Sequence, residues 1–178
     1  MNQNILFFIF FTVCTSLSIQ GADLRSEIDS NGSIYLHSLD DEGLSKAAQL
    51  VKNEEVIDLT ISGAKSDGSG LLSLFSAVKT SSYLKSLSLQ STSLVNEKVF
   101  MGFASIFANT TLTHITLRGI DLWPDDARII AENFTLNSTL QSFSVDYGLY
   151  GKLNEPILIN APNKNPNMRI NFISYCDY

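Results

Sequence analysis

The feature that most constrains this chain is a six-residue pattern that recurs every 28 residues. It begins at Val56, Leu84, Leu112 and Leu140, and apolar residues occupy its first, fourth and sixth positions each time. A polar residue separates the fourth and sixth positions, as expected of a strand with one buried face. Four copies at one interval indicate a stack of similar structural units.

The second half of each interval has helical spacing instead. Apolar residues recur at i, i+3, i+4 and i+7, which gives a helix one apolar face. The first complete example is Leu71, Leu74, Phe75 and Val78. We therefore predict helices near residues 42–51, 70–79, 97–107 and 124–134. We predict strands that begin near residues 34, 57, 85, 113 and 141.

The period divides the chain into units and identifies a core. The units lie near residues 28–55, 56–83, 84–111, 112–139 and 140–167, and a C-terminal cap follows at 168–178. The strands should pair in parallel, and Leu87, Ile106 and Leu117 should be core residues.

A polar column marks the turn between each helix and the next strand. Its members are Asn53, Ser81, Asn109, Asn137 and Asn165. Asparagine tolerates the left-handed backbone that often ends a helix. We therefore predict a recurring tight turn with that conformation.

The L-x-x-L-x-L strands and amphipathic helices at this period resemble the ribonuclease-inhibitor-like class of leucine-rich repeats, over residues 34–173. The resemblance implies an α/β fold, a short right-handed horseshoe solenoid. Parallel strands would line its concave face and helices its convex face. It also implies a role in binding other macromolecules. The family usually carries Asn or Cys at position 9, and here Ala64, Thr92 and Ile120 stand there. Only Thr92 can donate a hydrogen bond, so the family's buried polar ladder should be largely missing.

The two ends depart from the period, as terminal repeats must when they lack one neighbour. Ile34 and Leu36 should form a first strand, 25 residues before Leu59. Pro156 and Pro162 argue against a regular helix. We therefore predict an extended loop over residues 154–167. A closing strand containing Met168, Ile170 and Phe172 should follow.

The N-terminus predicts export. The apolar run Ile5–Val13 precedes small and polar residues and is too short to span a bilayer, which is typical of a secretory signal peptide. We expect a signal peptide over residues 1–22 and one mature domain over 23–178. The mature chain should be extracellular, or periplasmic if the source is bacterial. Cleavage removes Cys14 and leaves Cys176, which is either buried or forms a disulfide-linked dimer.

Charge narrows the range of partners. Lysine and arginine total 12 against 18 acidic residues, a net charge of -6. A nucleic-acid partner would require a basic stripe, and an anionic membrane surface would require a polybasic cluster. The sequence has neither, so we expect a protein or peptide partner, no nucleic acid, and no membrane insertion after signal cleavage.

The sequence contains few residue combinations that could support catalysis. In the predicted register His114 lies beside Ser86 and Ser142, but Asp58 lies on the far side of Ser86. Two histidines and one mature cysteine offer no metal-ligand cluster, and no motif indicates a cofactor. Residues 66–70 resemble a glycine loop but lack the lysine of a phosphate-binding loop, and should form a flexible connector.

Four sequons could carry glycans, at Asn31, Asn109, Asn133 and Asn137. Asn109 and Asn137 belong to the turn column, which explains them without a sugar. Asn31 lies in a turn and is the most credible acceptor.

We predict a secreted protein-recognition module without catalytic activity. Large or charged side chains gather on the third and fourth strands of the 28-residue series, as His114, Arg118, Asp146 and Tyr147. Gln90 occupies the position of Arg118 one repeat earlier, and Trp123 lies in the loop after the third strand. Tyrosine, tryptophan and arginine dominate interface energetics. Alternatively, Arg118 and Asp146 only pair across the sheet, and Trp123 only packs against the next loop. A self-assembling structural protein is the second functional reading, and a hydrolase is a remote third.

Overall fold

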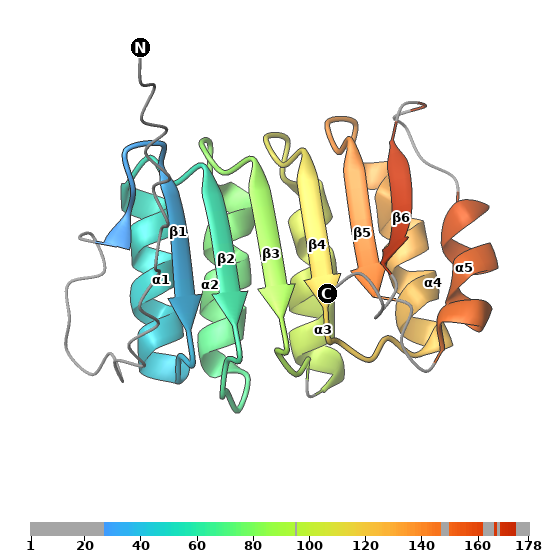
Figure 1. The fold of residues 1–178 in the computed structure, drawn as a ribbon, viewed down its shortest axis with the longest axis horizontal. Coiled ribbons are helices and arrows are strands. Elements are labelled where there is room, and N and C mark those ends of the chain that lie inside the picture. The colour runs from blue at the N-terminus through green and yellow to red at the C-terminus, as the bar shows by residue number, and fades with distance from the viewer. Residues whose placement is uncertain (1–26, 95, 147–149, 162–165, 167, 174–178) are drawn as a thin grey trace, which may run out of the picture.

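The computed structural model describes residues 27–94, 96–146, 150–161, 166 and 168–173. In these residues six parallel strands form one sheet, in the order in which they occur in the chain. They are β1 (Ser33–His37), β2 (Asp58–Ser62), β3 (Ser86–Gln90), β4 (His114–Arg118), β5 (Ser142–Asp146) and β6 (Arg169–Ile173). Figure 1 shows the strands side by side in front of a layer of helices.

The helical layer follows the predicted spacing. It consists of α1 (Asp41–Asn53), α2 (Ser69–Thr80), α3 (Glu97–Ala104), α4 (Pro124–Asn133) and α5 (Gly151–Ile159). Short 3-10 segments, η2 (Ser105–Ala108) and η3 (Phe134–Leu136), extend α3 and α4. The four predicted helices and five predicted strand starts are confirmed, each strand start within one residue. None of the helices described is long and apolar enough to cross a membrane.

The strand register confirms the repeat. Leu59, Leu87, Ile115 and Phe143 pair in turn across β2 to β5, each 28 positions after the last. At the first end, Ile34 pairs with Leu59, so the shorter predicted interval is also confirmed. At the other end, Ile170 pairs with Phe143 and Phe172 with Val145, so these two residues of β6 continue the inward columns.

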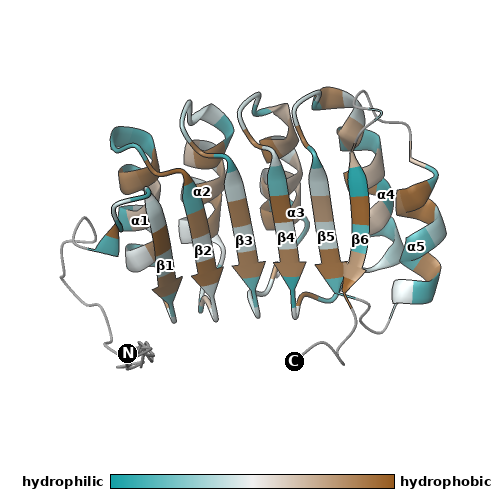
Figure 2. Cartoon of the chain, turned by 45° about the horizontal axis from the view of Figure 1, so that its top comes forward, coloured by the Kyte–Doolittle hydropathy of each residue, from teal (hydrophilic) through white to brown (hydrophobic). Residues whose placement is uncertain are grey.

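The core lies between the sheet and the helices. Leu87, Ile106 and Leu117 are fully buried there, as predicted. Five phenylalanine rings run through its centre with neighbouring centroids 5.3 to 6.1 Å apart: Phe75, Phe103, Phe107, Phe134 and Phe143. The apolar bands of successive strands lie level with one another in Figure 2. Aromatic contacts across several units make the core continuous.

The prediction of an extended loop after residue 154 is wrong for the part of that segment which the structure describes. Helix α5 contains Pro156, packs against α4 and buries Asn154 and Leu158 one turn apart. Proline removes one backbone hydrogen bond, and its exposed position keeps the ring out of the core. Burial of the inner face outweighs this local cost.

The left-handed backbone expected at the turn asparagines is also wrong. Asn109 (φ -68°, ψ 132°) and Asn137 (φ -112°, ψ 125°) are extended. Left-handed residues occur instead directly after β1 to β4, at Ser38, Gly63, Ser91 and Gly119. The asparagines need no special backbone because their side chains close the turns.

The two turn asparagines form a buried ladder between units. The Asn109 side-chain oxygen accepts the N–H of Thr111 and Leu112, and its Nδ2 donates to the carbonyls of Val78 and Ser81. Asn137 repeats this arrangement one unit later, and its Nδ2 donates to the carbonyl of Asn109 at 2.7 Å. Thr92, which stands at position 9 of its repeat and was the one residue there predicted to donate a hydrogen bond, donates to the carbonyl of Gln90. The main polar ladder therefore lies at the helix-to-strand turn.

The segment at residues 66–70 is anchored, contrary to the flexible connector predicted there. Asp41, the first residue of α1, accepts hydrogen bonds from the Ser66 hydroxyl and from the N–H groups of Asp67 and Gly70. Gly68, the N-cap residue of α2, has no side chain. A carboxylate from the preceding unit therefore caps this helix.

Candidate functional site

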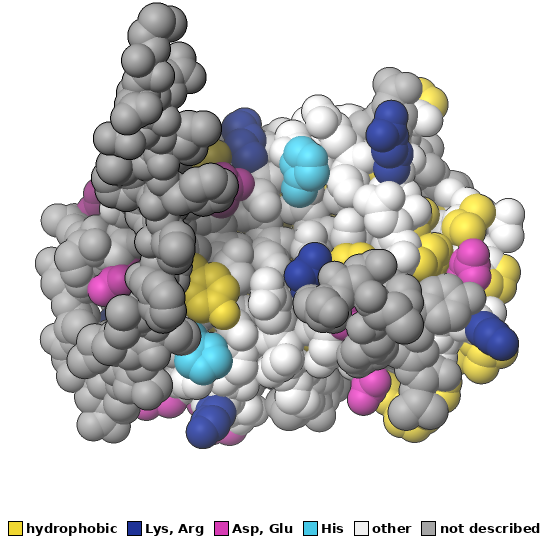
Figure 3. Space-filling model, viewed as in Figure 1, with side chains coloured by type: hydrophobic (Ala, Val, Ile, Leu, Met, Phe, Trp, Pro, Cys, Tyr) yellow, Lys and Arg dark blue, Asp and Glu magenta, His cyan; other side chains and the backbone are white. Residues whose placement is uncertain are grey.

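The strand face is the side of the sheet that points away from the helices, and it is largely uncharged. Three columns of outward residues cross the sheet. Two are in register across β1 to β5: Ser33, Asp58, Ser86, His114, Ser142; and Tyr35, Thr60, Ser88, Thr116, Ser144. The third, His37, Ser62, Gln90 and Arg118, is in register across β1 to β4, and Asp146 ends β5. Where the strand face is visible in Figure 3, backbone and side chains that are neither hydrophobic nor charged separate a few charged side chains. Such a face offers many hydrogen-bonding groups and few large anchors.

His114 has the neighbours that the predicted register gives it. It pairs in register with Ser86 on one side and Ser142 on the other. Its Nδ1 lies 2.8 Å from the Thr113 hydroxyl. Asp58 lies two strands away from His114, on β2, and accepts a hydrogen bond from Ser33. Among the described residues no group of three or more histidine, cysteine or acidic side chains is placed to hold a metal.

The predicted binding residues divide between the two ends of the strands. His114 begins β4, whereas Arg118 ends it, about 13 Å further along an extended strand. Gln90 pairs in register with Arg118, and Asp146 ends the next strand. We call Gln90, Arg118 and Asp146 the strand-end group. Tyr147 lies outside the described residues.

Asp146 has a structural role at the turn after β4. In earlier units the N–H of the left-handed residue donates to the last backbone carbonyl of the next strand. Gly63 donates to Gln90 at 2.8 Å, and Ser91 to Arg118 at 2.7 Å. The N–H of Gly119 donates instead to the Asp146 carboxylate. This side chain therefore takes the place of a backbone acceptor.

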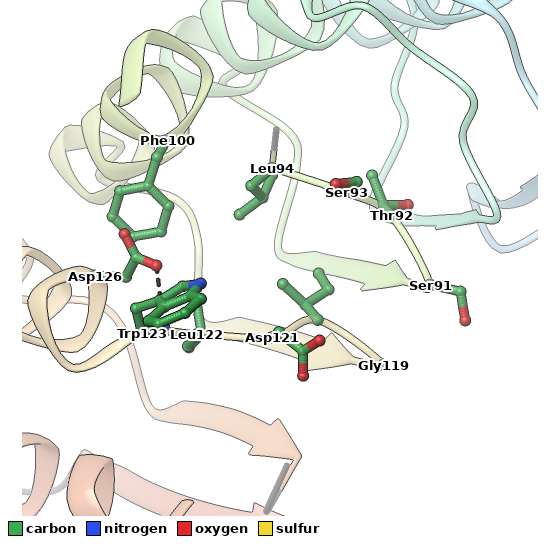
Figure 4. A pocket seen from close by; sticks show the side chains of 11 residues that line it. Ser91, Thr92, Ser93, Leu94, Phe100, Gly119, Asp121, Leu122, Trp123 and Asp126 are labelled. Atoms are coloured by element: carbon green, nitrogen blue, oxygen red, sulfur yellow. Dashed lines mark hydrogen bonds between the residues drawn. The ribbon is translucent and has the colours of Figure 1, made fainter. Parts of the chain in front are cut away.

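A hollow of about 470 Å³ lies next to the strand-end group. We call it the loop pocket. It is bounded by the loop between β3 and α3 and the loop between β4 and α4. Its described lining combines apolar Leu94 and Phe100, the hydroxyls of Ser91 and Ser93, and acidic Asp126. Figure 4 shows these groups around the opening. Of the lining residues the sequence had identified only Trp123 as a candidate, since the others have no recognisable motif.

Trp123 forms one wall of the loop pocket. It precedes α4 and is 58% exposed. Its ring lies 4.7 Å from that of Tyr150, tilted by 32°, so one side of the indole is covered. Its backbone N–H donates to Oδ2 of Asp126 at 3.0 Å (Figure 4), which fixes the start of α4.

Asp126 is held in an unfavourable environment for a carboxylate. Burial raises its pKa above 3.8, the hydrogen bond from Trp123 opposes that effect, and the charge of Asp125 adds to it. Arg128 pairs with Asp125. A cation at the pocket would relieve this cost, because it would favour the ionised form of Asp126.

The sequons differ in accessibility. Asn109 and Asn137 are 3% exposed, and the Nδ2 atoms that would carry a glycan are engaged in the turn ladder. The Nδ2 of Asn133 donates to the carbonyl of Ile129 within α4. Asn31 is exposed in the turn before β1. In the folded chain Asn31 is therefore the most accessible of the four acceptors.

The fold defines a class, an α/β repeat-like protein whose parallel strands form one sheet. A solved structure with this fold is that titled "Leiomodin-1 Actin-Binding Site 2". The TM-score is 0.52 with 13% sequence identity, over 78% of this chain and 87% of that one. At this identity the similarity shows the fold alone. No family model matches the sequence, and no curated protein does.

Proposed function

We propose that this chain is an exported leucine-rich-repeat module of the ribonuclease-inhibitor-like class, which binds a protein partner and has no catalytic activity. The observation that supports this function best is the loop pocket beside the strand-end group. It places an exposed tryptophan and unfilled volume next to an arginine, at the edge of a strand face on which most side chains are small and polar. Aromatic and arginine side chains beside a pocket are typical of interface anchors.

The structural neighbour supports a protein as the partner class. Its title describes a site that binds actin, so a fold of this kind presents a protein-binding surface there. We carry over only the class of partner. The net charge of -6 favours a partner with a basic surface over a nucleic acid.

Affinity capture from the extracellular medium of the source organism tests this proposal. The mature chain should retain a specific protein, and Arg118→Ala or Tyr147→Ala should each weaken binding by more than about 1 kcal/mol with little change in melting temperature. Met101→Ala is a matched control, because Met101 is 51% exposed on α3, in the helical layer. If the control weakens binding and the other two variants do not, the helical layer is the binding surface.

Export is part of the proposal and rests on residues 1–22, which lie outside the described residues. Secreted material should begin between residues 19 and 23. Mass spectrometry that detects intact Met1 in the medium, or a chain retained in the cytosol, would refute it.

Self-association is the second candidate function. Leu153 and Ile159 are 58% and 55% exposed on α5, the last helix described. Cys176, which lies outside the described residues, could link two copies. Size-exclusion chromatography with and without reductant separates the two cases. A recognition module should elute as a monomer under both conditions, whereas a disulfide-linked protein should elute as a dimer only when reductant is absent.

A further inference from the structure

We infer that the loop pocket binds an arginine side chain of the protein partner. This assignment deepens the proposed function and rests on it for the identity of the partner as a protein.

The charge of the pocket lining favours a cationic ligand. Among the described residues that line the pocket, Asp121 and Asp126 are acidic and none is basic. Two arginines lie close by in sequence and outside the lining: Arg128 is paired with Asp125, and Arg118 ends β4. A ligand cation would therefore find carboxylates whose charge the lining itself does not balance.

The aromatic and apolar side chains of the pocket favour a ligand that carries a planar cation on a long apolar stem. Tyr150 covers one side of the Trp123 ring, and Trp123 also lines the pocket. Guanidinium groups stack on indole faces more readily than ammonium groups do. The apolar side chains of Leu94 and Phe100 line the same hollow and could contact the methylene groups of the arginine stem.

Hydrogen-bond acceptors complete the arrangement. Guanidinium carries five N–H donors in a fixed plane and has no acceptor. Asp126 supplies carboxylate oxygens at one side of the pocket. A carboxylate accepts two parallel N–H bonds from a guanidinium, whereas an ammonium group acts only as a point charge.

The test uses the full chain and three pentapeptides. Acetyl-Gly-Gly-Arg-Gly-Gly-amide is compared with the same peptide carrying citrulline, which is neutral and similar in shape, or lysine. Trp123 is the only tryptophan, so its fluorescence reports on the pocket directly. We expect saturable binding of the arginine peptide below about 10 mM and at least about tenfold weaker binding of the citrulline peptide. Lysine should fall between them.

Two variants assign the effect to the pocket. Asp126→Asn keeps an oxygen that can accept the Trp123 N–H but removes the charge, and it should weaken arginine-peptide binding by about tenfold. Glu132→Gln removes an equal charge from an exposed position of the same helix and should change binding less than about twofold. Circular dichroism establishes that both variants remain folded.

The outcomes separate this inference from the proposed function. It is overturned if the arginine peptide does not saturate, if citrulline or lysine binds equally well, or if Asp126→Asn binds like the parent. A captured partner whose binding is unaffected by Asp126→Asn also overturns it and leaves the proposed function standing. Saturable, Asp126-dependent arginine binding without any captured protein supports the pocket and counts against the proposed function.

Discussion

Asn109 is a residue whose side chain fixes the backbone of two neighbouring units. It is 3% exposed and makes hydrogen bonds to backbone groups of its own turn and of the turn before it. Removing it leaves several buried backbone groups without partners, and each such group costs about 1–3 kcal/mol. The same column contains an asparagine in a different environment, Asn53, which is exposed at the end of α1.

This contrast gives the first prediction. Asn109→Ala should lower the free energy of unfolding by about 3 kcal/mol, because the turn loses its buried acceptor and donor. Asn53→Ala should change it by less than about 0.5 kcal/mol, as is usual for a surface substitution. Urea unfolding followed by circular dichroism measures both. Equal losses would show that position in the column, rather than burial, determines the effect.

The environment of Asp41 predicts that the stability of the fold depends on pH. Partial burial acts to raise its pKa, but hydrogen bonds from Ser66, Asp67 and Gly70 outweigh it and lower the pKa from 3.8 to about 2. The carboxylate binds its proton more weakly in the folded state. Its stabilisation is therefore complete above about pH 4 and is lost as pH falls towards 2.

The variant Asp41→Asn removes this titration. Its unfolding free energy should fall less steeply than that of the parent between pH 4 and 2, in denaturant titrations at fixed ionic strength. Asp40→Asn serves as the control, since Asp40 caps α1 itself through the N–H of Gly43. If the Asp41→Asn and parent curves stay parallel, the anchor does not depend on the charge.

Residue-level prediction succeeded where a side chain follows the period and failed where its role depends on a partner in space. The spacing identified Asn109 and Asn137 as turn residues but not their extended backbone, because the side-chain contacts arise between units. Asp126 has the sequence context of an ordinary helix-start acid. Only the fold places it in a hollow beside Trp123 and Phe100.

Among the elements, α5 combines burial with an interior proline. Pro156→Ala should raise the unfolding free energy by about 1–2 kcal/mol, since alanine restores a backbone donor and fits a helix better, although the unfolded chain gains freedom. Chemical denaturation measures the gain, and amide hydrogen exchange localises it to α5. Pro124→Ala is the control, because proline at the first position of α4 removes no helical bond. A loss of stability for Pro156→Ala would mean that the ring itself packs favourably.

Element boundaries were predictable because two periodicities alternate in this sequence, and the apolar positions of the strand and helix patterns face the same core. The exception is α5, where the burial of Asn154 and Leu158 one turn apart outweighs the local tendency of proline to end a helix. Tertiary contacts routinely override such local preferences.

At the scale of the whole molecule, the phenylalanine cluster joins the units into one cooperative body. Phe107 contacts the rings of Phe103, Phe134 and Phe143. Phe107→Ala should cost about 3–5 kcal/mol. With so few units, parent and variant should each unfold in one step, so that Trp123 fluorescence and far-ultraviolet circular dichroism give the same midpoint. Separate midpoints would show that the units unfold independently.

The parallel α/β architecture followed from the repeat, whereas the partner did not. The 28-residue repeat predicts which residues face the core. For outward residues such as Arg118 it predicts only that they are polar. Recognition depends on how neighbouring loops meet, as they do around the loop pocket, and that arrangement requires coordinates.

The constant register also makes the chain divisible. Because β2 to β5 align at intervals of 28 residues, excising residues 84–111 would bring Leu59 beside Ile115 and keep every inward side chain inward. Removing one residue more or fewer would turn the following strand over. The molecule can thus be shortened or lengthened only in whole units, and each junction between neighbours is a place where a new recess could arise without disturbing the rest.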